Sequence, residues 1–219
     1  MRAQPRLSVQ RCLTRPSRGL APASRVEPLM SNVRPRMHKL GHLEAGDWVE
    51  HAYAAVYQRP GSPEELQRVV AGVPGGDPGV FGRLVESLAS PFYLLYVLHT
   101  PRGEGPAGRY QSPAIEGAEL RQFLARFSGY LSGDARFDLW AHSPAESATV
   151  VWDRHNQVFA YGPLARYELV LQGLGFSSGQ VSVPSPHQHF YRAELDSEAA
   201  LILEALNWSH SPLREGDEQ

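Results

Sequence analysis

The chain has 219 residues, of which 42% are hydrophobic and 20% are charged. This length and composition are sufficient for one globular domain with a full apolar core. The longest uninterrupted apolar run, residues 92–98, has seven residues, whereas a membrane-spanning helix needs about 20. We therefore expect a cytoplasmic protein that does not bind a membrane.

The formal net charge of −2 combines two segments of opposite charge. Residues 1–39 hold nine basic residues and one acidic residue, whereas residues 40–219 hold 12 arginines and 22 acidic residues, a net charge of −10. Such a body repels phosphate backbones, so it disfavours nucleic-acid binding and favours a basic protein partner. The single cysteine, Cys12, lies in the basic segment, which excludes a disulfide or a thiolate metal site from the acidic body.

Residues 1–36 are rich in Arg, Ser and Pro and show no hydrophobic periodicity. A segment of this composition buries too little apolar surface to fold, so we predict a disordered basic leader. Its composition is also that of an organellar transit peptide. We favour the interpretation that translation starts at Met30 or Met37. A single domain is expected over 37–208, followed by a flexible tail over 209–219.

Three helices are predicted at the start of the folded domain. Residues 45–58 place apolar side chains at helical spacing behind an Asp-x-x-Glu capping pattern. Residues 63–71 follow a Ser-Pro-Glu-Glu start signal. After a turn-rich connector over 72–79, residues 81–88 carry their apolar side chains on one helical face.

Strands and helices are predicted to follow one another in the rest of the domain. The run 92–98 lacks polar alternation, which is typical of a strand covered on both faces. In chain order we then predict a loop over 102–113, a helix over 118–131, strands over 137–142, 148–152 and 158–161, a helix over 163–174, a last strand from 181–183 and 188–193, and a helix over 198–206. This order predicts an α+β fold in which helices pack on one face of a mixed four- to five-stranded sheet, with the helical N-terminal segment alongside.

The sequence lacks the common motifs of catalysis and cofactor binding. It contains no G-x-x-x-x-G-K-[ST] or G-x-G-x-x-G phosphate loop, no G-x-S-x-G nucleophile elbow and no H-E-x-x-H zinc motif. The glycine-rich stretch 72–79 contains prolines, which have no amide proton to donate to a phosphate. No cofactor is expected from motifs, and only a divalent metal ion remains as a candidate.

The chain has nine histidines, which are the candidate ligands of such a metal ion. His187 and His189 are one residue apart in a predicted strand, so their imidazoles project from one face and can meet one metal ion. His142 ends a predicted strand and His155 lies in the turn of a predicted hairpin, and we add both to the predicted metal site. His99, at the end of the run 92–98, is a further candidate. The alternative is that these histidines only hydrogen-bond to loop backbone.

Trp152, Asp153 and Tyr191 are candidate binding residues. Aromatic side chains in strands can form a binding platform, but they more often pack in the core, and this alternative applies to Trp152 and Tyr191. Asp153 lies in a polar hairpin turn, for which ordinary turn chemistry is the alternative.

Three strings resemble those of small bacterial proteins that carry a domain of unknown function. They are Trp152-Asp-Arg-His-Asn156, Ala160-Tyr-Gly-Pro-Leu164 and Pro186-His-Gln-His-Phe-Tyr191. The resemblance covers about residues 90–195. It implies that the hairpin and the PHxH strand are shared features, and it assigns no catalytic residue.

Three candidate functions follow from these patterns. The acidic body without motifs favours a non-enzymatic interaction module, such as an immunity or antitoxin-like protein that holds a basic partner. The alternative is a small metal-assisted hydrolase that uses His187 and His189 with His142 or His155. A small-ligand sensor on the exposed face of the sheet is a third possibility.

Overall fold

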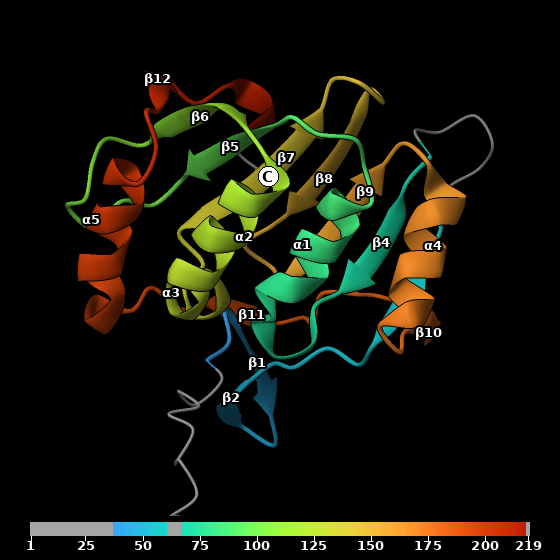
Figure 1. The fold of residues 1–219 in the computed structure, drawn as a ribbon. Helices are drawn as coiled ribbons and strands as arrows, with labels where there is room; N and C mark the ends of the chain where they lie inside the picture. Colours follow the sequence, from blue (N-terminus) through green and yellow to red (C-terminus); the bar gives the residue numbers. More distant parts are fainter. Residues whose placement is uncertain (1–36, 61–66, 218–219) are drawn as a thin grey trace, which may run out of the picture. The chain divides into compact units, whose positions relative to one another are not determined.

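Two β-sheets, and helices that pack on the larger one, make up the fold (Figure 1). The structure is a computed structural model, and it describes residues 37–60 and 67–217, which belong to one compact unit of the chain. The predicted leader, residues 1–36, lies outside the described residues. The α+β class is confirmed.

The larger sheet has nine strands, not the four or five predicted. In spatial order they are β10 (Ser177–Ser178), β3 (Val56–Gln58), β4 (Val69–Gly72), β9 (Gln157–Tyr161), β8 (Ala148–Trp152), β7 (Phe137–Ser143), β5 (Phe92–Leu98), β6 (Gly108–Ile115) and β12 (Ser209–Ser211). Neighbouring strands are antiparallel except β10 and β3, which are parallel. The smaller sheet has the order β11 (His187–His189), β1 (Leu40–Glu44) and β2 (Asp47–Glu50).

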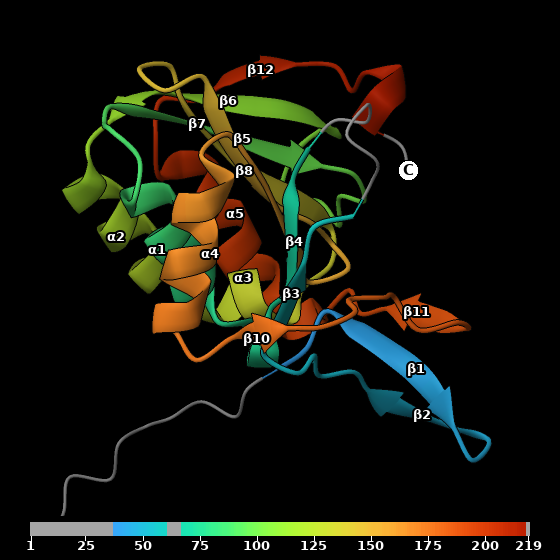
Figure 2. The same ribbon diagram turned by 90° about the vertical axis from the view of Figure 1, so that its right-hand side faces the viewer.

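Helices cover one face of the larger sheet. They are α1 (Pro78–Glu86), α2 (Gly117–Arg126), α3 (Ser128–Gly133), α4 (Leu164–Gly173) and α5 (Asp196–Glu204), and short 3-10 turns lie at Pro74–Gly76, Ala193–Leu195 and Glu215–Asp217. Figure 2 shows α1, α2 and α4 on one side of the strands and the smaller sheet on the other side. The core lies between these helices and the sheet, where Phe81 of α1 packs on Trp152 of β8 at 6.2 Å between ring centroids. The opposite face of β7, β8 and β9 is therefore not part of this core.

The predicted helix over 45–58 is wrong. Ala45 and Gly46 have positive φ angles of 50° and 96°, which suit a two-residue hairpin turn, and this turn joins β1 to β2. The apolar spacing was misleading because Trp48 stays 47% exposed instead of packing in a core. Strand pairing with β11 and β1 thus prevails over the helical pattern in this segment.

The structure also corrects three predictions between residues 63 and 131. The predicted helix 63–71 lies partly outside the described residues, and its end forms β4, whose four residues are all buried. The predicted loop 102–113 contains most of β6, whose residues from Gly108 to Gln111 alternate between the two faces. The predicted helix 118–131 is divided at Phe127 into α2 and α3.

The C-terminal segment also differs from the prediction. Of the predicted last strand, only residues 188 and 189 are in a strand, as part of β11 in the smaller sheet. The tail predicted to be flexible from residue 209 begins with β12, which pairs with β6. Trp208 explains this order, because its ring packs on Tyr96 and Phe123 and its Nε1 donates to the Ile202 carbonyl. By contrast, β5, the β8–β9 hairpin and α4 lie within about one residue of their predicted bounds, and α1 and α5 overlap their predicted helices but begin two to three residues earlier.

No helix in the described part of the chain is long and apolar enough to span a bilayer.

A fully buried arginine fixes the start of β7. The guanidinium of Arg136 donates to both carboxylate oxygens of Asp134 at 2.8 and 2.9 Å, and to Glu104 at 3.1 Å. The side chains of Asp134 and Glu104 are 0% and 1% exposed. Arg136 also donates to the Arg192 carbonyl and to Asp196, which ties the segment after β11 to the larger sheet.

We predict that Arg136→Met lowers the free energy of unfolding by about 3–5 kcal/mol, because it leaves two buried carboxylates without a counter-charge. The matched control is Arg121→Met, whose ion pair with Glu86 involves an arginine side chain that is 64% exposed, so its loss is expected to cost less than about 1 kcal/mol. Urea denaturation of both variants measures the difference. Equal losses in the two variants would contradict the assignment.

Candidate functional site

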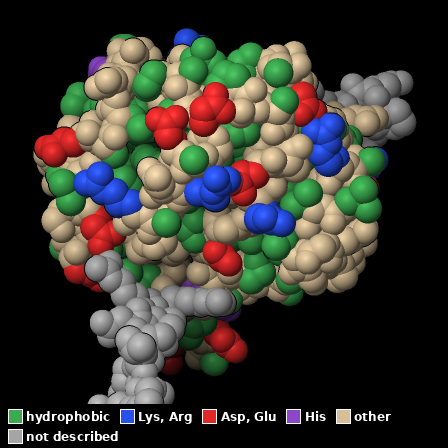
Figure 3. Space-filling view, in the orientation of Figure 1, with side chains coloured by type: hydrophobic (Ala, Val, Ile, Leu, Met, Phe, Trp, Pro, Cys, Tyr) green, Lys and Arg blue, Asp and Glu red, His purple; other side chains and the backbone are tan. Residues whose placement is uncertain are grey.

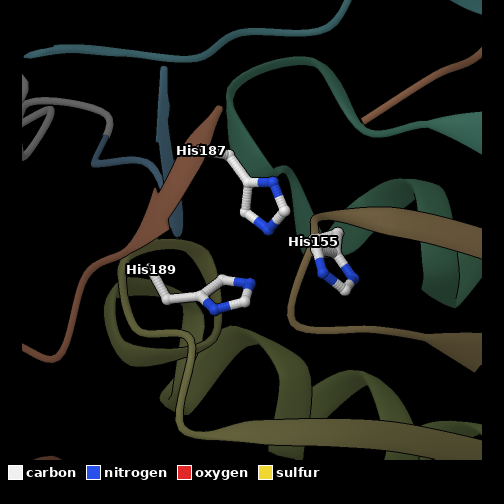
Figure 4. Close-up of side chains that lie close together, drawn as sticks. All are labelled: His155, His187 and His189. Atoms are coloured by element: carbon white, nitrogen blue, oxygen red, sulfur yellow. The ribbon is translucent and has the colours of Figure 1, made fainter. Parts of the chain in front are cut away.

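Three histidines from the two sheets converge at one point. His187 and His189 alternate along β11, so their side chains project from the same face of the smaller sheet. His155 faces them from the turn between β8 and β9 (Figure 4). One nitrogen from each of the three side chains lies within 4.8 Å of the others. The ring centroids are 4.8 to 5.4 Å apart.

The turn that carries His155 is held by several hydrogen bonds. Asp153 Oδ1 accepts from the Gln157 amide at 2.8 Å, and Trp152 Nε1 donates to Asn156 Oδ1 at 2.9 Å. Asn156 adopts a positive φ of 63°, a conformation that asparagine tolerates better than most residues. The position of His155 is therefore set by the turn.

Hydrogen bonds also orient the imidazole rings. His155 Nδ1 lies 2.9 Å from Asp153 Oδ2, and His187 Nδ1 lies 3.0 Å from the Pro184 carbonyl oxygen. Because both oxygens only accept, each Nδ1 is the donor, and Nε2 of both rings takes no part in these contacts and carries a lone pair in the neutral imidazole. Metal-binding histidines are commonly oriented in this way by a carboxylate or a carbonyl.

The burial of His189 also favours metal binding. Its Nε2 is buried and has no hydrogen-bond partner among the described residues. Burial lowers the pKa of His189 to about 4, and the neighbouring His155, Arg154 and His187 act in the same direction. The ring is therefore neutral at pH 7, which is the form that binds a metal ion.

Three imidazoles in this arrangement suit zinc or a similar transition-metal ion. Such a set occupies three positions of a tetrahedron and leaves the fourth for water or substrate. In such an arrangement, Asp153 would orient a metal ligand, because its carboxylate accepts from His155 Nδ1.

The other predicted site residues lie elsewhere. His142 Nδ1 is 2.9 Å from Thr149 Oγ1, and His142 is not part of the histidine group. His99 Nε2 is 3.0 Å from Asp138 Oδ2. Trp152 is fully buried in the core and so cannot form part of a binding surface. Tyr191 is 37% exposed, and its ring centroid lies 6.3 Å from that of His189, so it borders the site.

Lys39 is a residue of the site that sequence reasoning missed. Its side chain is fully buried, with Nζ 4.1 Å from the ring centroid of Trp152 and 4.4 Å from that of Phe137. Nζ donates to the Asp153 carbonyl at 3.3 Å, directly below the turn that carries His155. The one available signal was that Lys39 is the single lysine in a chain with 20 arginines.

Three more histidines lie in or beside the smaller sheet. His42 lies opposite His187 in the strand register, and the rings of His42 and His51 are 5.0 Å apart and nearly perpendicular. His38 Nδ1, His42 Nδ1 and His51 Nε2 are buried without a hydrogen-bond partner among the described residues. Burial lowers the pKa of His51, and His42 and His38 add to this effect. The surroundings of the site are thus rich in histidine.

A cavity of about 600 Å³ is lined by His155 and by residues on the face of β7, β8 and β9 opposite the core. Its lining comes from β7, β8 and β9, the turn after β8, the residue before β4 and the C-terminal segment. The lining residues are Arg68, Asp138, Trp140, Thr149, Val151, Asp153, Arg154, His155, Phe159, Tyr161, Gly216 and Asp217. A molecule in this cavity would lie next to an ion bound at His155.

No family model matches the sequence, and comparisons with curated proteins and with solved structures found no significant match. The resemblance to small bacterial proteins therefore stays a prediction. Any functional assignment rests on the geometry of the histidine site and the cavity.

We predict that Asp153→Asn weakens zinc binding by about 10- to 100-fold, as the loss of an orienting carboxylate does in other metal sites. Asparagine keeps one oxygen to accept from the Gln157 amide, so the turn should persist. Asp47→Asn in the exposed β1–β2 hairpin is the control. Calorimetric titration with Zn²⁺ measures the affinities, and an unchanged affinity in the Asp153 variant would argue against an orienting role.

We also predict a pH-dependent contribution of Lys39 to stability. Burial lowers its pKa from 10.5 to about 8, although Asp153, Asp138 and Asp134 act in the opposite direction. Between pH 8 and about 9.5 the unfolded chain keeps the Lys39 proton and the folded chain has released it. The free energy of unfolding therefore rises with pH in this window, by at most about 1.4 kcal/mol per pH unit.

In Lys39→Met this rise should be lost, while other groups that titrate in the same range remain. Urea denaturation of the natural chain and the variant at several pH values between 8 and 9.5 isolates the difference. Parallel curves for the two proteins would show that Lys39 does not titrate in this window.

Proposed function

We propose that the protein binds one divalent metal ion, preferably zinc, at His155, His187 and His189, and that the ion activates water for hydrolysis. One observation carries this proposal, namely that three imidazoles converge while hydrogen bonds hold two of them with Nε2 free. A three-histidine set with an open fourth position is typical of catalytic zinc and not of structural zinc.

The chemistry follows from the open position. Zinc lowers the pKa of a bound water to about 7 and so supplies hydroxide near neutral pH. In this chain, His155 belongs both to the metal site and to the lining of the cavity. A substrate in the cavity would therefore lie within reach of the nucleophile, which supports hydrolysis over metal storage.

The interaction module with a basic partner stays a prediction from composition. Figure 3 shows arginines interspersed with acidic side chains on the face that the helices form. Several of these arginines are paired, including Arg121 with Glu86 and Arg166 with Glu146. This face therefore offers no continuous acidic surface, and the metal site is the better supported candidate.

Metal binding is tested on the full chain after removal of metal with a chelator. We expect one equivalent of Zn²⁺ per chain in calorimetric titration, and an affinity at least 100-fold lower in the His187→Ala, His189→Ala double variant. His142→Ala is the matched control, because it removes a histidine that lies outside the group. Binding that is not stoichiometric, or that survives in the double variant, would refute the metal site.

Hydrolysis is tested separately with a panel of ester and phosphoester substrates. Activity should disappear on chelation, return with Zn²⁺ and rise with pH through about 7, where the metal-bound water ionises. A chain that binds zinc stoichiometrically but shows no zinc-dependent hydrolysis of any panel member would retain the metal site and lose the hydrolase assignment.

A further inference from the structure

The floor of the cavity beside His155 is built by the strand register. Trp140 of β7 lies opposite Val151 of β8, which lies opposite Phe159 of β9, and the next row on the same face contains Thr149 and Tyr161. Residues directly opposite one another in antiparallel strands project to the same side. The floor is therefore a broad apolar and aromatic surface that matches a flat ring.

Hydrogen-bond donors without a carboxylate partner among the described residues border this floor. Trp140 Nε1 is buried and has no hydrogen-bond partner among the described residues, which leaves a desolvated N–H that normally costs about 1–3 kcal/mol. Arg68 lies with its guanidinium 5.2 Å from the Phe159 ring centroid, and it donates to the Tyr161 hydroxyl at 3.2 Å. Arg154 extends from the turn beside His155. Within residues 37–60 and 67–217, no carboxylate is ion-paired with Arg68 or Arg154.

The acidic residues of the lining, in contrast, already have partners. Asp138 accepts from the Arg154 amide and is paired with His99. Asp153 accepts from the Gln157 amide and from His155. Asp217, which lines the same cavity, is paired with Arg109. The donors that remain available thus outnumber the acceptors, so the cavity is complementary to an anion.

We propose that the cavity binds a small organic anion in which a carboxylate or phosphate group is attached to a flat apolar ring. The ring lies on Trp140 and Phe159, and the oxyanion accepts from Arg68, Arg154 and Trp140 Nε1. The inference that this anion is the substrate rests on the proposed hydrolase function, since the ester to be cleaved would lie between the ring and His155. The binding itself requires only the cavity.

The test uses the full chain with its metal removed by a chelator, so that zinc cannot hold the anion. Benzoate and phenyl phosphate are titrated against tryptophan fluorescence and by calorimetry, with benzyl alcohol as the uncharged analogue of similar size. We expect the anions to bind at least tenfold more tightly than benzyl alcohol. Arg68→Gln and Arg154→Gln should each weaken anion binding about tenfold or more, and Arg121→Gln on the opposite face should leave it unchanged.

Trp140→Phe provides the sharpest variant. It keeps an aromatic ring on the floor and removes the N–H together with part of the indole. Anion affinity should therefore fall severalfold, and by a larger factor than the affinity for benzyl alcohol, because an N–H donor contributes more to a charged acceptor than to an uncharged one. Equal affinity for anions and benzyl alcohol, undiminished binding in the arginine variants, or no anion binding up to millimolar concentration would overturn the proposal. Stoichiometric zinc binding in the same preparation would show that the metal site stands even if the anion site fails.

Discussion

The buried ammonium group of Lys39 connects the two sheets of the protein. The backbone carbonyl of Lys39 accepts from the Phe190 amide, next to β11. The side-chain ammonium lies against the rings of Phe137 and Trp152 and donates to the Asp153 carbonyl. A cation held in a dry environment needs such partners, because isolated burial is costly. The same contacts set the distance between β11 and the turn of His155, on which the histidine site depends.

A second group of charged side chains supports the same arrangement at the segment that follows β11. Arg192 donates through its amide to Asp134 and through its guanidinium to the Gly133 and His38 carbonyls and to Glu50. Asp134 is also the main partner of Arg136 at the start of β7. Lys39 and Arg192 therefore both hold the segment that follows His189, and charged side chains take part in both contacts.

The sequence predicts the local part of this structure and not the long-range part. Helix α1, strand β5 and the β8–β9 hairpin are recognisable because capping, apolar runs and turn residues act over a few positions. Strands such as β1, β4 and β6 owe their state to partners far along the chain, which no local pattern reveals. The PHxH spacing indicated His187 and His189, but whether His142 or His155 joins them depends on how the smaller sheet packs.

Because the three histidines come from two sheets, an ion bound by them would act as a cross-link in the tertiary structure. His155 belongs to the central hairpin of the larger sheet, and the other two ligands belong to a sheet of three short strands whose outer hairpin is largely exposed. Ligand binding to the folded form stabilises the elements that it joins. The stability of the smaller sheet would then depend on the metal concentration, and amide hydrogen exchange in β1, β2 and β11 would slow when the ion binds.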